Sequence, residues 1–135
     1  MGMAVVLQAL PASSYSTPSR QQQGFYDTKI VFEAPNPTWF ENIAVRYNGQ
    51  NLVTTISAPV LLQVDPSQKR DSVTVAQIPD ATGILGIVEL GKDVFYVSAG
   101  DMSNVTVTSL VFPTKIWQVD MRPFRANQRG NVTRP

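Results

Sequence analysis

The sequence predicts an all-β chain of two consecutive antiparallel sheets, and three observations support this class. Val, Ile and Thr are frequent, and ten prolines and eight glycines punctuate them, which is typical of strands joined by turns. Asn48-Gly49 separates two apolar segments and is a strong hairpin signal, because a type I′ turn needs positive φ at both positions. The pattern that begins at Glu41 then recurs from Leu85.

The first part of the chain is expected to form one short strand and then a meander. The short strand covers Thr28–Glu33, and Pro35 and Pro37 end it. Turn signals then separate four apolar segments, at 43–46, 51–56, 60–65 and 72–78. We therefore expect a four-stranded antiparallel meander between Glu41 and Ile78.

The second part repeats this order of elements. Leu85–Leu90 takes the place of Glu41–Arg46 at a spacing of 44 residues, and Lys115–Asp120 takes the place of Val60–Asp65 at a spacing of 55. Most of the difference falls in the loop 100–114. A period of about 40–50 residues with four strands per repeat is typical of a β-propeller blade. A chance match of Gln-Val-Asp is the alternative, but four successive elements agree in order.

The expected organisation has three parts. Residues 1–27 form a flexible lead-in or the remnant of a signal peptide, 28–120 hold the two repeats, and 121–135 form an irregular tail with four arginines and no acid. A linker explains the tail better than a nucleic-acid-binding arm. Propellers contain about four to eight blades, so we expect the two repeats to be part of something larger.

Composition excludes several function classes. A net charge of +1 argues against nucleic acid as a partner. The sequence contains no run of about 20 apolar residues, so it predicts no membrane span. Without cysteine or histidine the chain has no thiolate site and no Ser-His-Asp triad. Cytoplasmic and secreted locations both stay open, because Met3–Leu10 weakly matches a secretory segment and Asn104 and Asn131 lie in glycosylation sequons.

The candidate site lies where the first strand of each repeat begins. In an antiparallel sheet this end adjoins the end of the second strand, so Glu41 and its neighbours should meet the Ser57–Pro59 turn and the loop 100–114. We expect this edge to bind a small-molecule substrate, with no catalytic residue identified. The candidate substrate-binding residues are Trp39, Phe40, Glu41, Asn42 and Asp101. A purely structural role for Glu41 is an equal alternative, and the loop is either a lid or a hairpin that covers a sheet edge.

Four segments resemble the first two blades of the fungal branch of the gluconolactonase/regucalcin-like family. They are Pro37–Arg46, Asn48–Gln50, Leu62–Pro66 and Pro79–Ile87. The resemblance implies a partial six-bladed β-propeller, with about two four-stranded antiparallel blades plus an N-terminal strand, Thr28–Glu33, suited to completing the last blade. It covers roughly Thr28 to Asp120 and is more specific for the branch than for a reaction.

Two activities follow from this resemblance. Hetero-Diels–Alderases of tropolone–sesquiterpenoid pathways need no metal or cofactor and hold a diene and a dienophile in a reactive arrangement. Family lactonases use a divalent cation, Ca²⁺ or Zn²⁺, with a first-blade glutamate as one ligand, and Glu41 matches that position. We expect a fungal secondary-metabolite enzyme of the first kind. A metal-dependent lactonase, and a non-catalytic propeller fragment, are the alternatives.

Overall fold

The computed structural model describes residues 4–7, 27–68, 71–103, 113–124 and 129–135. Within these residues the chain is all-β, as expected, and two four-stranded antiparallel sheets dominate it. The first sheet contains β3 (Phe40–Val45), β4 (Asn51–Thr55), β5 (Val60–Val64) and β6 (Val73–Gln77). The second contains β7 (Gly83–Gly91), β8 (Val94–Gly100), β9 (Thr114–Asp120) and β10 (Asn131–Thr133). No described segment is a helix that could cross a bilayer.

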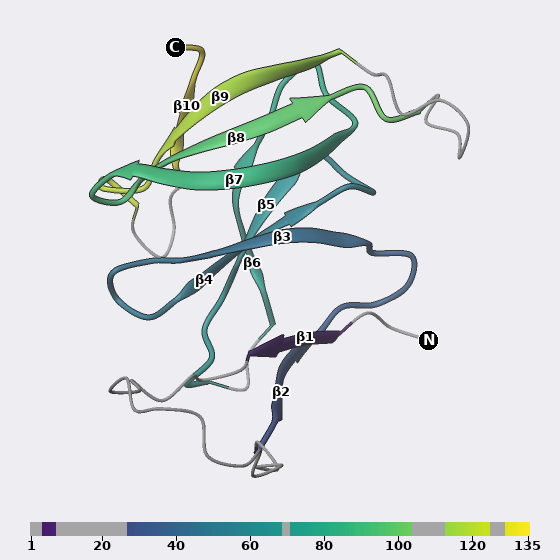
Figure 1. Ribbon diagram of the computed structural model, residues 1–135, viewed down its shortest axis with the longest axis vertical. Coiled ribbons are helices and arrows are strands. Elements are labelled where there is room, and N and C mark those ends of the chain that lie inside the picture. Colours follow the sequence, from purple (N-terminus) through teal and green to yellow (C-terminus); the bar gives the residue numbers. More distant parts are fainter. Residues whose placement is uncertain (1–3, 8–26, 69–70, 104–112, 125–128) are drawn as a thin grey trace, which may run out of the picture.

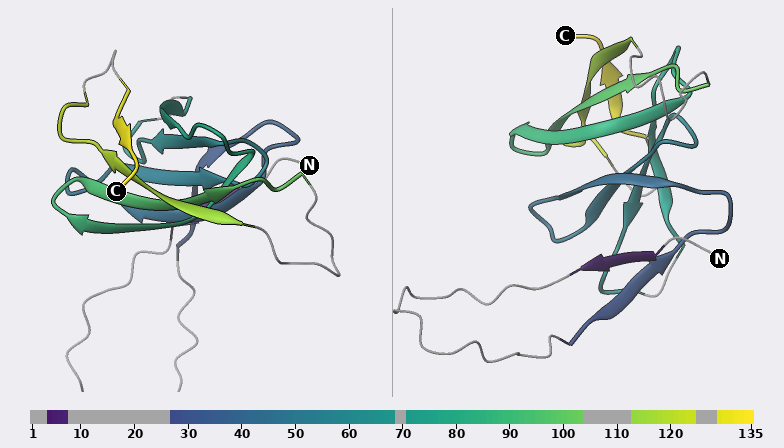
Figure 2. Two further views of the ribbon diagram at one scale, coloured as in Figure 1. Left: turned by 90° about the horizontal axis from the view of Figure 1, so that it is seen from above. Right: turned by 45° about the vertical axis from the view of Figure 1, so that its right-hand side comes forward.

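The two sheets form layers, and a short ribbon adds a third. The ribbon pairs β1 (Ala4–Leu7) with β2 (Lys29–Glu33) and lies on the side of the first sheet that faces away from the second (Figures 1 and 2). Each four-stranded sheet is a simple meander, with β3 and β7 at one end of its strand order and β6 and β10 at the other. The strand β7 contacts β3, β4 and β5, and β10 contacts β6, so the first strand of the second sheet crosses three strands of the first.

Strand register confirms the spacing of the repeat. Val53 pairs with Leu62 in the first sheet, and Val97 pairs with Trp117 in the second, which reproduces the spacings of 44 and 55 residues. Positive φ recurs at the same spacing, at Gly49 and Asp93, because each residue closes the hairpin between the first two strands of its sheet.

A β-bulge recurs at the same place in both first strands. The register shifts between Phe40 and Ile43 in β3 and between Ile84 and Ile87 in β7. In each sheet, a hydroxyl oxygen on the second strand accepts a hydrogen bond from a backbone N–H at the bulge. The N–H of Asn42 donates to Thr54 Oγ1 at 2.9 Å. The N–H of Gly86 donates to Ser98 Oγ at 3.0 Å. The bulge is therefore a built feature of the repeat rather than a local irregularity.

Two short strands lie where the sequence indicated irregular chain. β10 lies in the tail that was expected to be irregular, and it pairs with the third strand of the second sheet. Its anchor is the N–H of Gly130, which donates to the Val75 carbonyl at 2.6 Å. β1 lies within the expected lead-in and pairs with β2. A strand of three or four residues is too short for a period-2 pattern to indicate it.

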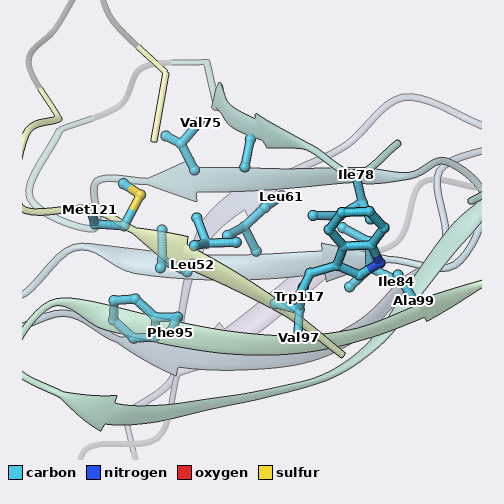
Figure 3. Close-up of a cluster of buried hydrophobic side chains, with 12 residues drawn as sticks. Leu52, Leu61, Val75, Ile78, Ile84, Phe95, Val97, Ala99, Trp117 and Met121 are labelled. Carbon is cyan, nitrogen blue, oxygen red and sulfur yellow. The ribbon is translucent and has the colours of Figure 1, made fainter. Parts of the chain in front are cut away.

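The main hydrophobic core lies between the two sheets. In Figure 3, one side of this core consists of Leu52, Leu61 and Val75 of the first sheet and Ile78, which follows β6. They face Phe95, Val97, Trp117 and Met121 of the second sheet. Burial of each large side chain contributes about 1.5–3 kcal/mol, so this interface supplies most of the driving force that joins the sheets. A smaller cluster lies between the first sheet and β2, where the rings of Phe32 and Phe40 are 6.0 Å apart.

One buried ion pair crosses the main core at its hairpin end. Arg46 follows β3 and Asp93 lies in the β7–β8 turn, and they are 5% and 3% exposed. Two donors of the Arg46 guanidinium bond the Asp93 carboxylate, at 2.8 and 2.5 Å. A third donates to Gln63 Oε1 at 2.6 Å. The Asp93 carbonyl also accepts from the N–H of Met121 at 2.9 Å, so the pair joins three turns.

We predict that Asp93→Gly, which keeps the positive-φ turn but removes the carboxylate, lowers the free energy of unfolding by about 3–5 kcal/mol, because it leaves Arg46 buried without a counter-ion. The double variant Arg46→Leu/Asp93→Gly should recover most of this loss. It copies the residues Leu90 and Gly49 that stand at the equivalent positions. Urea unfolding measures both. Equal losses in the single and double variants would contradict the argument.

Candidate functional site

The edge at which β3 and β7 begin, called here the start edge, brings together most of the predicted features. The N–H of Trp39 donates to Ser57 Oγ at 3.0 Å. The N–H of Ile56 donates to the Trp39 carbonyl at 3.0 Å. These bonds hold the segment before β3 against the turn between β4 and β5. Antiparallel pairing thus places Trp39 beside Ser57, as the sequence indicated.

The segment after β8 reaches the same edge through a close backbone approach. A Cβ at Gly83 would clash with the Ile56 carbonyl oxygen and lie 2.9 Å from Cγ of Met102. Only glycine leaves room for both the Ile56 carbonyl and Met102 at this point of β7. The rest of the predicted lid or hairpin, residues 104–112, lies outside the described residues.

Trp39, Glu41 and Asn42 present their side chains to solvent at this edge. The Trp39 side chain is 61% exposed. Asn42 uses its side-chain oxygen locally, where it accepts from the N–H of Ile43 at 2.8 Å. Glu41 is exposed and has no hydrogen bond or ion pair with any described residue. Its carboxylate is therefore available to a ligand.

Phe40 has a different position from its neighbours. Only 7% of it is exposed, and it packs in the small cluster between the first sheet and β2. Strand alternation turns Phe40 inward where Glu41 turns outward. Phe40 therefore anchors the start of β3, and its ring does not line the exposed surface.

Asp101 lies at the end of β8 and accepts three hydrogen bonds. The Ser103 hydroxyl donates at 2.6 Å. The Ser103 N–H donates at 2.9 Å, and Thr82 Oγ1 lies 3.2 Å away. The bonds from Ser103 are the main cause that holds the pKa of Asp101 below its ordinary value, with a small contribution from Thr82, and slight burial opposes them. Asp101 is therefore a carboxylate whose hydrogen bonds stabilise the turn in which it lies.

The described residues offer limited means to hold a metal or a large ligand. No group of three or more acidic side chains comes together within the described part of the chain. A shallow depression of about 390 Å³ lies just before the start edge, lined by Glu33, Ala34, Pro35 and Asn36. Glu41 can supply one oxygen ligand to a hard cation, and a complete site would need others.

A second depression lies at the opposite, hairpin edge, which the sequence did not single out. It has a volume of about 320 Å³, and its walls include Arg46, Gln63, Asp93 and Phe124. Arg46 directs its donors to Asp93, Gln63, Gln50 and the Met121 carbonyl. These polar groups satisfy one another, so this depression offers less for binding than the start edge does. No pattern in the sequence indicated that Arg46 and Asp93 would pair.

Comparison of the chain with protein-family models, with curated proteins and with solved structures finds no match. The geometry of the start edge therefore carries the functional argument.

We predict that Ser103→Ala raises the pKa of Asp101 toward its ordinary value, because the strongest hydrogen bond to the carboxylate is lost. The lowered pKa of Asp101 favours the folded state above its ordinary pKa, and this contribution disappears as pH falls through the folded value. Carboxyl-carbon NMR titration measures the shift. Ser67→Ala, in the matching Asp65 turn, is the control and should leave Asp101 unchanged.

Proposed function

We propose that the start edge binds an apolar small molecule and that the chain is part of a six-bladed propeller enzyme that promotes a hetero-Diels–Alder type cyclisation. One observation carries the proposal: the aromatic ring of Trp39 and the carboxylate of Glu41 are both exposed on the same edge. The internal repeat, with its matched bulges and hairpins, supports the propeller.

A pericyclic reaction needs little from the protein besides shape and polarisation. A flat apolar surface such as the Trp39 ring can hold the reactants against each other, which reduces the entropy lost in bringing them together. Hydrogen bonds to a heteroatom lower the barrier further, and the Asn42 amide nitrogen lies at the same edge. In this function Glu41 orients a hydroxyl of the substrate.

An expected outcome tests this role of Trp39. The full chain should accelerate the cycloaddition of an α,β-unsaturated ketone with a vinyl ether, and Trp39→Ala should lower that acceleration about tenfold. Tyr47→Ala removes another exposed aromatic ring, at the hairpin edge, and should have no effect. Chromatographic measurement of the dihydropyran product gives the rates. Equal losses in both variants would exclude a specific role for the start edge.

The uncommitted carboxylate of Glu41 favours one second candidate, a metal-dependent lactonase. In that function Glu41 would hold a divalent cation, which supplies Lewis-acid activation of water, and further ligands would have to come from outside the described residues.

The lactonase function predicts Ca²⁺- or Zn²⁺-dependent hydrolysis of an aromatic lactone such as dihydrocoumarin. Chelation and Glu41→Gln should each abolish the hydrolysis, whereas Asp71→Asn, which changes an exposed acid between β5 and β6, should not. Cycloaddition that survives chelation and Glu41→Gln would instead support the cyclase. If neither reaction is accelerated, a non-catalytic propeller is the remaining function.

A further inference from the structure

The face of the second sheet that points away from the first sheet is uncovered by any described residue, and it carries large aliphatic side chains beside Tyr96 and Gln118, which bond each other at 2.8 Å. Val88, Leu90 and Ile116 lie on it with 50%, 71% and 51% of their surface exposed. We call it the outer face of the second sheet. Three large aliphatic side chains on one sheet face are what an interaction surface presents.

The internal repeat shows what kind of surface such a face packs against. At the spacings of 44 and 55 residues, Val88 corresponds to Ala44, Leu90 to Arg46 and Ile116 to Leu61. In the first sheet these residues face the second sheet, where Leu61 is fully buried, Arg46 is 5% exposed and Ala44 packs against the core. The outer face of the second sheet therefore repeats the face through which the first sheet packs on its neighbour.

The matching partner surface is also present in the chain. Within the chain, Ile87 of β7 packs against the core that the first sheet forms with the second. Its equivalent at the spacing of 44 residues is Ile43 of β3, and Val45 lies on the same side of that strand. These residues are 39% and 55% exposed. We propose that the outer face of the second sheet docks on the β3 side of the first sheet of another copy of this chain, head to tail.

The loss of both charges at one pair of equivalent positions favours this pairing. The Arg46–Asp93 ion pair joins the two sheets within the chain. Leu90 and Gly49 stand at the equivalent positions, so the contact between copies would bring an aliphatic side chain against a glycine. Both members of the pair change together, and no unpaired charge would be buried.

A hydrogen bond shows the same correspondence. The Thr54 hydroxyl accepts from the Asn42 N–H and donates to the Leu85 carbonyl of the second sheet at 2.7 Å. Its equivalent, Ser98, accepts from the Gly86 N–H but donates to no residue in the described part of the chain. The residue equivalent to Leu85 is Glu41. The Ser98 hydroxyl of one copy would thus donate to the Glu41 carbonyl of the next.

The β1–β2 ribbon has to move for this contact to form. β2 covers Val53 and Val64 on the outer part of the same face of the first sheet, through the partly buried Val31 and Phe32. A neighbouring sheet that meets Ile43 and Val45 would occupy that space. Amide hydrogen exchange of β2 should therefore become faster on assembly, and unchanged protection would contradict this docking.

A head-to-tail contact closes into a ring when its rotation allows. The number of copies rests on the proposed function, since a six-bladed propeller built from two sheets per chain requires three copies. The docking contact itself follows from the repeat alone. An experiment can therefore contradict the number of copies without contradicting the contact.

The test is the assembly state of the full chain, measured by sedimentation equilibrium. The wild type should sediment as three chains. Leu90→Arg should raise the dissociation constant at least about tenfold, because it places an unpaired charge in the contact. Leu90→Arg/Gly49→Asp should restore assembly, because it recreates the Arg46–Asp93 pair between copies. Gly49 has φ of 82° and open space at its Cβ. An aspartate is strained at positive φ but can adopt it, as Asp93 does at φ of 60°, so the new ion pair has to outweigh this strain.

Val73→Arg, on β6 and away from both docking surfaces, is the matched control and should assemble like the wild type. A monomeric wild type would overturn the docking proposal, as would assembly that is indifferent to Leu90→Arg. Assemblies of two or four chains that respond to these variants as expected would support the docking and overturn the six-sheet count. A wild type that assembles as expected but accelerates neither the cycloaddition nor the lactone hydrolysis would count against the proposed function alone.

Discussion

The contact between Arg46 and Asp93 determines how the two sheets are placed. Hydrophobic packing joins the sheets but is non-directional, and it alone would tolerate small shifts of one sheet over the other. A buried guanidinium that bonds one carboxylate through two of its nitrogens tolerates almost none. Asp93 also fixes Met121 through its carbonyl. The hairpins of both sheets and the end of β9 are therefore held in one arrangement.

This arrangement explains why the two edges of the sheets differ in chemistry. At the hairpin edge, Gln63 and Gln50 each accept a hydrogen bond from the buried Arg46 guanidinium. Those side chains stabilise the fold and are not available for binding. At the start edge the backbone is satisfied by bulge hydroxyls and short turns, such as the bond from Asn42 N–H to Thr54. The side chains of Trp39 and Glu41 stay exposed at this edge.

Local chemistry made much of the fold predictable. The Asn48-Gly49 turn and the alternation that follows it depend on neighbouring residues, and the spacing of 44 residues reappears in the register of the strands. Long-range contacts were not predictable. Nothing near Asp93 in the sequence indicates that its partner is Arg46. The inward position of Phe40 depends on β2, and β10 depends on the backbone of Val75.

The two tryptophans have contrasting surroundings, and this has a practical consequence. Trp117 is 7% exposed in the core, with the Arg134 guanidinium 5.3 Å from its ring centroid, whereas Trp39 is 61% exposed at the start edge. Their fluorescence should separate, with a blue-shifted emission from Trp117 and a red-shifted emission from Trp39 that soluble quenchers can reach. The molecule thus contains two natural optical probes, one of sheet packing and one of surface events, and neither requires a label.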